Sequence, residues 1–169
     1  MKKLGLLTAI GLCCGIAASA DTPPPLAPMS FWAGHCFKGD FPDGKRSDEH
    51  CFAWVFEGKV LRDRHVVRTP GQPDYVGETV YVWDSTVGRI TYLYYENAGG
   101  ISVGIATPTA DGMDFPPASY AEPGEKSIVY RARWTKQGTD SYEAFSEMQK
   151  GEQWVPLFKM VLKATPPSP

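Results

Sequence analysis

The sequence predicts an all-β protein: a single antiparallel meander that closes into a barrel of about eight to ten strands. Gly and Pro divide the chain at short intervals, and most of the runs between them have the length of a strand. These runs are rich in β-branched and aromatic residues, as in CFAWVFE, ETVYVWD and RITYLYY. Because strand-like runs do not alternate with helical ones, a parallel α/β fold is not expected.

The first twenty residues predict a secretory signal peptide. The basic pair Lys2-Lys3 precedes a mostly apolar run at 4–17, and Ala18-Ser19-Ala20 is a small-x-small site for cleavage near Ala20. The apolar run is too short and too poorly flanked to span a membrane. Cys13 and Cys14 leave a lipoprotein signal as an alternative, although neither follows the small residue that lipidation usually requires. We therefore expect a periplasmic or secreted protein.

The mature chain is expected to form one domain, with a Pro-rich segment at 21–29, the barrel at 30–163 and a Pro-rich tail at 164–169. Loss of Lys2-Lys3 leaves 15 basic and 19 acidic residues, a net charge of −4. No basic patch and no second apolar span is visible, so we expect neither a nucleic-acid partner nor a transmembrane segment in the mature chain. We expect a monomer or a weak dimer, with both Pro-rich ends extending into solvent.

Strand-like segments follow one another along the chain. GHCFKG opens the first, and CFAWVFE and KVLRDRHVV form the next two, joined by a two-residue turn at Glu57-Gly58. ETVYVWD and RITYLYY follow, separated by a loop at 84–89, and YRARW at 130–134 alternates apolar residues with Arg. The segment DSYEAFSEMQK at 140–150 fits helical spacing as well as strand alternation. We assign it to a strand because its neighbours are strands.

The opening FWAGHCFKG resembles the strand-opening Leu-x-Gly-x-Trp segment of calycin-type barrels, with Gly34-His35-Cys36 at the Gly-x-Trp position. The meander that follows, with YVWD, ITYLYY and a closing W-x-P-L-F-x-M strand, is similar to secreted bacterial lipocalin-like barrels of unknown function, the DUF1579-like group. The resemblance covers about residues 30–163. It implies a calycin-like barrel, and it implies haem as one possible ligand, because haem binders occur among similar barrels.

Two cysteines remain after signal cleavage, Cys36 and Cys51, and in an oxidising compartment we expect them to form a disulfide. Antiparallel pairing of the first two strands would place Cys36 opposite Cys51 and Phe37 opposite His50. The chain-entropy account gives such a staple about 3 kcal/mol of stabilisation. The spacing excludes a redox pair of the CxxC type.

The turn after the second strand would place His50 opposite His65 and bring Asp48 and Asp63 to the same face. With His35 diagonal to His50, three histidines on adjacent strands could hold a metal ion or haem. We prefer the interpretation that they are hydrogen-bonded polar groups of the barrel, because a slip of one residue would separate them. No metal or cofactor is therefore assigned. A metal or haem site through these three histidines remains an alternative.

The aromatic face of the second strand is the expected inner face, and the arginines of the third strand, Arg62, Arg64 and Arg68, are expected outside. A closed barrel of this size can hold a small ligand. We expect an exported barrel that binds a small, partly apolar molecule without catalysis. The expected ligand-binding residues are His35, Phe37, His50, Phe52, Trp54, Asp63, His65, Tyr92, Tyr94 and Trp134.

One motif suggests catalysis. Gly100-Ile101-Ser102-Val103-Gly104 matches the G-x-S-x-G nucleophile elbow, but the following IATPTADG cannot begin a helix and no histidine follows His65. We expect these glycines to mark a bulge or a close strand crossing. Two other function classes stay open: a barrel isomerase or hydrolase that uses His50 and His65, and a structural or protein-interaction module with a filled barrel.

Overall fold

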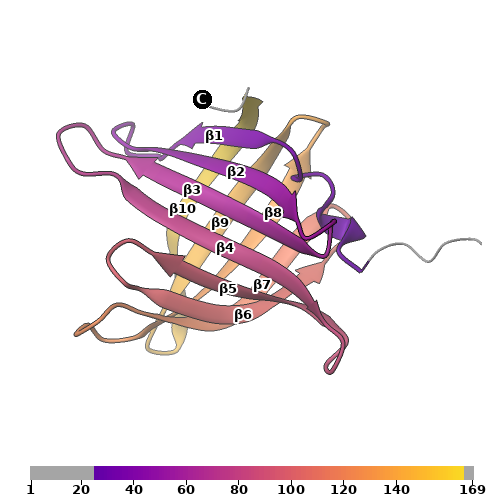
Figure 1. Cartoon of the computed structure of the whole chain (residues 1–169). Helices are drawn as coiled ribbons and strands as arrows, with labels where there is room; N and C mark the ends of the chain where they lie inside the picture. The colour runs from indigo at the N-terminus through magenta and orange to yellow at the C-terminus, as the bar shows by residue number, and fades with distance from the viewer. Residues whose placement is uncertain (1–24, 166–169) are drawn as a thin grey trace, which may run out of the picture.

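The computed structural model describes residues 25–165, which form a closed antiparallel barrel of ten strands (Figure 1). Each strand pairs with the strands before and after it in the sequence, and β1 closes the barrel against β10. The predicted all-β meander barrel is therefore confirmed. The predicted signal peptide at 1–20 and the last residues of the Pro-rich tail, 166–169, lie outside the described residues.

The shortest strand is β1, with five residues, and the longest is β10, with 13. A single-turn 3₁₀ helix, η1, precedes them at Ala27–Met29. No helix within 25–165 has the length and apolar character needed to cross a membrane. The strands are β1 Cys36–Asp40, β2 Ser47–Val55, β3 Val60–Arg68, β4 Tyr75–Asp84, β5 Arg89–Glu96, β6 Ile101–Pro108, β7 Gly112–Ala121, β8 Ile128–Gln137, β9 Ser141–Lys150 and β10 Gln153–Thr165.

The β2–β3 hairpin has the predicted register. The Lys59 N–H donates to the Phe56 carbonyl at 3.2 Å, and the two residues between them, Glu57-Gly58, both have positive φ. This backbone suits a two-residue hairpin turn, whose twist matches that of the flanking strands. It places His50 directly opposite His65. The segment of ambiguous periodicity at 140–150 is also a strand, as predicted, and forms β9.

The predicted disulfide is present between Cys36 of β1 and Cys51 of β2. The two residues are cross-strand partners, and Phe37 is opposite His50 in the same register. The cysteines are 15 residues apart in sequence. The staple therefore closes a short loop and joins the first strand, which also pairs with the last strand of the barrel, to its neighbour in sequence.

The segment before β1 packs against the barrel, which corrects the expectation that the whole Pro-rich start extends into solvent. Leu26, Met29 and Trp32 are at most 2 % exposed. The Trp32 ring lies 5.5 Å from the ring of Trp134 and 5.8 Å from that of Tyr142, both on the inner face of the barrel. Burial of these large apolar side chains holds the segment, while the prolines only restrict its backbone.

Around Trp134 of β8 the interior is packed with aromatic side chains. Its ring centroid lies 4.7 Å from that of Phe115, 5.3 Å from Tyr142 and 5.7 Å from Phe52. All four side chains belong to one buried apolar core, which continues to the N-terminal segment. This part of the barrel is a filled core of edge-to-face aromatic contacts.

Candidate functional site

A second part of the barrel interior is polar. Strand alternation directs Asp48 and His50 of β2 and Asp63 and His65 of β3 inward, and Tyr94 of β5 approaches them. We refer to these five residues as the histidine cluster. Asp48 is 4 % exposed and Asp63 is 1 % exposed, so the cluster holds two buried carboxylates.

The carboxylate of Asp48 lies between the two imidazoles. It is 3.2 Å from His50 Nε2 and 3.3 Å from His65 Nδ1. The second nitrogen of each ring also has a partner: His50 Nδ1 is 2.9 Å from Asp63 Oδ2, and His65 Nε2 is 3.3 Å from the Tyr94 hydroxyl. The two rings stack with centroids 4.8 Å apart. Both imidazoles are therefore held from two sides, which fixes their orientation.

The two buried carboxylates set the charge of His50. Burial by itself would lower the pKa of His50, but the charges of Asp63 and Asp48, with their hydrogen bonds, raise it well above its usual range. Burial would likewise raise the pKa of Asp48, but His50 and His65 lower it. His50 is thus an imidazolium at neutral pH. With both ring nitrogens protonated and donating, it has no lone pair with which to act as a general base.

Gly77 of β4 makes room for the His65 ring. It is the cross-strand partner of His65. A Cβ atom at this position would clash with the imidazole of His65 and with the ring of Tyr94. The absence of a side chain here therefore permits the two rings to approach each other over β4.

Tyrosines continue the polar network from His65 toward the end of the barrel that carries the β3–β4 and β5–β6 turns. Tyr94 shares a short hydrogen bond with Tyr75, the first residue of β4. Tyr120 donates to Glu122 at 2.7 Å and lies 3.3 Å from Glu96. Burial raises the pKa of all three tyrosines, so their phenols remain neutral hydrogen-bonding groups.

The structure brings together four of the predicted binding residues: His50, Asp63, His65 and Tyr94. The predicted cross-strand position of His50 and His65 and the inward position of the two aspartates are confirmed. Sequence reasoning left Tyr75 and Tyr120 out of the site. Tyr75 follows a loop whose sequence, TPGQPD, does not fix the β3–β4 register, so no pattern placed it beside His65.

His35 is not part of the cluster. Its carbonyl accepts the Phe52 N–H at 2.9 Å, as the predicted pairing requires. Its side chain is nevertheless exposed and its ring packs against Phe37, with centroids 6.1 Å apart. His35 precedes the first residue of β1, so the barrel wall does not enclose it. The expectation of three clustered histidines is therefore wrong for His35; His50 and His65 alone form the pair.

The remaining predicted binding residues lie in two other environments. Trp54 is 38 % exposed because it is the next-to-last residue of β2, at the rim of the barrel rather than within it. Phe37, Phe52, Tyr92 and Trp134 are at most 9 % exposed and belong to the apolar core. Two of them contact the histidine cluster: the rings of Phe52 and Trp134 lie 6.0 Å and 6.1 Å from that of His50.

The G-x-S-x-G motif lies along β6, not in a turn between a strand and a helix. Ser102 is buried and accepts a hydrogen bond from the Tyr130 hydroxyl at 3.1 Å. The β6–β7 pairing is irregular between Ser102 and Thr107, and a Cβ atom at Gly104 would clash with the Tyr92 ring. The expected bulge and close approach are thus both found.

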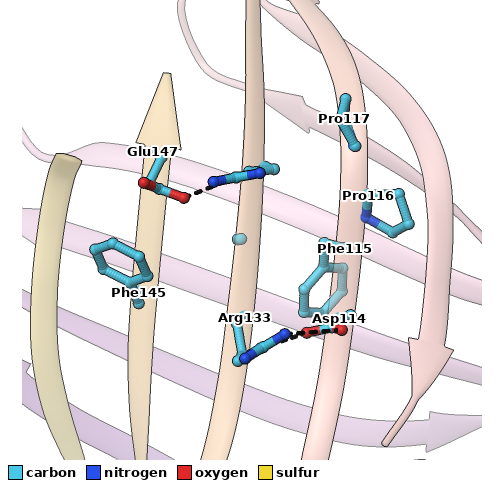
Figure 2. A pocket seen from close by; sticks show the side chains of 9 residues that line it. Asp114, Phe115, Pro116, Pro117, Arg133, Phe145 and Glu147 are labelled. Carbon is cyan, nitrogen blue, oxygen red and sulfur yellow. Dashed lines mark hydrogen bonds and ion pairs between the residues drawn. The ribbon is translucent and has the colours of Figure 1, made fainter. Parts of the chain in front are cut away.

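A hollow of about 520 Å³ lies on the outer face of the barrel, over β7, β8 and β9 (Figure 2). Pro116 and Pro117 shape one wall, where the β7–β8 register shifts. Two ion pairs cross its floor: Arg133 with Asp114 at 2.6 Å and Arg131 with Glu147 at 2.7 Å. Each guanidinium therefore has a carboxylate partner, and both ion pairs lie on the outer face, whereas the aspartates of the histidine cluster are buried.

No protein-family model matches the chain, and no curated protein matches it either. The side chains of the histidine cluster and the tyrosines next to it are therefore the features that indicate a function.

Proposed function

We propose that the protein is an exported barrel that binds a small, partly apolar molecule through the polar part of its interior, without catalysis. The observation that carries the proposal is the histidine cluster itself. Two buried carboxylates and an imidazolium inside a barrel are costly to desolvate, and an apolar core of the same volume would serve stability equally well. Groups of this kind, with strongly shifted pKa values, concentrate at functional sites.

The polar interior has the surfaces that such a ligand needs. The side chains of His50 and His65 are 15 % and 12 % exposed, so solvent reaches them although their aspartate partners are buried. The rings of Tyr75 and Tyr94 each lie 5.7 Å from that of His65 and offer apolar faces beside phenol groups. A few polar groups that orient the guest among aromatic walls are typical of small-molecule sites.

The proposal includes export of the protein and its relationship to lipocalin-like barrels. The Cys36–Cys51 disulfide suits an oxidising compartment, which supports the signal peptide predicted from the first twenty residues. The closed antiparallel meander supports kinship with secreted bacterial lipocalin-like barrels of the DUF1579-like group. Both the N-terminal sequence and the fold thus favour a binding protein that acts outside the cytoplasm.

The packed interior around Trp134 favours a second candidate, a protein-interaction module with no interior ligand. An isomerase or hydrolase that uses His50 as a base is less favoured, because both nitrogens of that ring face carboxylates. The ligand-binding barrel and the interaction module differ in where small molecules would bind. A ligand-binding barrel responds to small molecules at His50 and His65, whereas an interaction module responds to them only on its outer face.

Nuclear magnetic resonance of the mature protein labelled with ¹⁵N-histidine tests the proposal. The protein has three histidines, and His35 outside the cluster is an internal control. In a screen of small aromatic and polar fragments, we expect hits that shift the imidazole signals of His50 and His65 and leave His35 unchanged. Hits that move none of these signals, or that move His35 alone, would favour the interaction module.

A further inference from the structure

We propose that the histidine cluster binds one divalent transition-metal ion of the zinc class, with Asp48, His50 and His65 as its ligands. The inference deepens the proposed function and rests on it, because it names the chemistry of a guest for the same polar interior. It stands on three features of the geometry: the spacing of the ligand atoms, the partners of the other ring nitrogens and the charge of the buried groups.

The three ligand atoms already converge. A carboxylate oxygen of Asp48 and one ring nitrogen from each of His50 and His65 lie within 4.8 Å of one another. Ligand atoms about 2.0–2.2 Å from a tetrahedral zinc ion are separated by about 3.4 Å. The two oxygens of Asp48 already lie close to the two nitrogens, Oδ2 at 3.2 Å from His50 Nε2 and Oδ1 at 3.3 Å from His65 Nδ1. Small rotations of the side chains would therefore bring all three onto one ion, with no movement of the strands.

The other nitrogen of each ring has the partner that a metal-bound histidine needs. An ion that binds here would displace the Nε2 proton of His50 into solvent, while Nδ1 keeps its donation to Asp63 at 2.9 Å; the freed Nε2 lone pair lies on the Asp48 side of the ring. In the tautomer that would bind an ion, His65 Nε2 would donate to the Tyr94 hydroxyl, 3.3 Å away, and the Nδ1 lone pair would face the same carboxylate. Carboxylates and other acceptors in this position fix the tautomer and orientation of metal-ligating histidines and increase their basicity.

The donor set selects the class of ion. Two imidazoles and one carboxylate suit zinc, iron(II), nickel or copper, whereas magnesium and calcium prefer oxygen ligands alone. As neutral ligands the two histidines carry no charge, so Asp48 and Asp63 would contribute two negative charges, which one divalent ion balances. Three protein ligands leave a coordination position open for water or for a donor atom of a small molecule.

Zinc titration of the mature, disulfide-bonded protein by calorimetry, after treatment with a chelator, tests the inference. We expect one zinc ion per chain in the wild type. The variants Asp48→Asn and His65→Gln should each weaken zinc binding at least 100-fold, because each removes a ligand. Asp63→Asn should weaken it about 10- to 100-fold, because it weakens the orientation of His50. His35→Gln is the matched control, since it removes the histidine outside the cluster and should bind zinc as the wild type does.

A second measurement does not depend on the folding of any variant. Zinc added to the ¹⁵N-histidine-labelled wild type should shift His50 and His65 and leave His35 unchanged. Wild-type protein that binds no zinc, or zinc binding that survives in both Asp48→Asn and His65→Gln, would overturn the inference. The proposed function is judged separately in metal-free protein: organic fragments that shift His50 and His65 there would uphold it even if zinc does not bind.

Discussion

Asp63 shows how one buried residue organises its surroundings. It is 1 % exposed and sits opposite Phe52 in the β2–β3 ladder, at the boundary between the apolar core and the histidine cluster. An isolated carboxylate there would be strongly destabilising. The nearby Nδ1 of His50 compensates for this burial, and the ring of His50 in turn reaches Asp48. The charge of His50 thus depends on the two carboxylates that it contacts.

A pH dependence of stability follows for the metal-free protein. The folded state raises the pKa of His50 above the usual value of about 6.5. The stabilisation is therefore fully present below about pH 6.5 and is lost as the pH rises through the folded-state pKa. Urea unfolding in the presence of a chelator should show a free energy of unfolding that falls from pH 6.5 to pH 9.

Variants of His50 and His35 show whether His50 causes this pH dependence. His50→Gln should lower the stability at pH 6 and remove most of this slope, whereas His35→Gln should keep the slope of the wild type. The same slope in wild type and in His50→Gln would show that the buried carboxylates do not raise the pKa of that imidazole.

At the scale of elements, the sequence was most informative where a short turn links two strands. The two-residue turn at Glu57-Gly58 set the β2–β3 register, and with it the His50–His65 pair. Strand patterns did not predict the side-chain positions of residues that lie outside the paired strands. His35 precedes β1, so strand pairing could not show that its side chain faces solvent.

The N-terminal segment was beyond sequence analysis for a similar reason. Its prolines are typical of an extended tail, and its three anchors lie three residues apart without any strand or helix long enough to give a recognisable period. The packing site of Leu26, Met29 and Trp32 exists only in the folded barrel, where they join its core. Tyr75 and Tyr120 reach the polar interior through loops of undetermined register, so their part in the site could not be predicted either.

The anchoring of this segment leads to a prediction. Trp32 is fully buried against Trp134 and Tyr142, so Trp32→Ala should lower the free energy of unfolding by about 3–5 kcal/mol. Trp83→Ala is the control, because Trp83 is 41 % exposed and should cost about 1 kcal/mol or less. Urea titrations of the two variants make the comparison. Equal losses would mean that the segment does not contribute to the barrel core.

At the scale of the whole molecule, the barrel interior has an apolar part and a polar part. Large aromatic side chains and the N-terminal segment fill one part, and the disulfide joins β1 to β2. The rigid ladder of β2 and β3 then presents the histidine cluster in the other part, with tyrosines leading to the barrel end. A rigid scaffold of this kind holds polar groups in place for a ligand more firmly than loops would.

A crystal structure of the protein isolated from its own cells without chelators tests the ligand proposal most directly. We predict electron density for a bound ion or small molecule in contact with His50 or His65 and bordered by Tyr94. An anomalous signal at that position would identify a transition metal. Density for an organic molecule without an anomalous signal would still support the broader ligand proposal. Well-ordered side chains around an interior that holds only water, with ligand density confined to the outer hollow over β7–β9, would contradict the account.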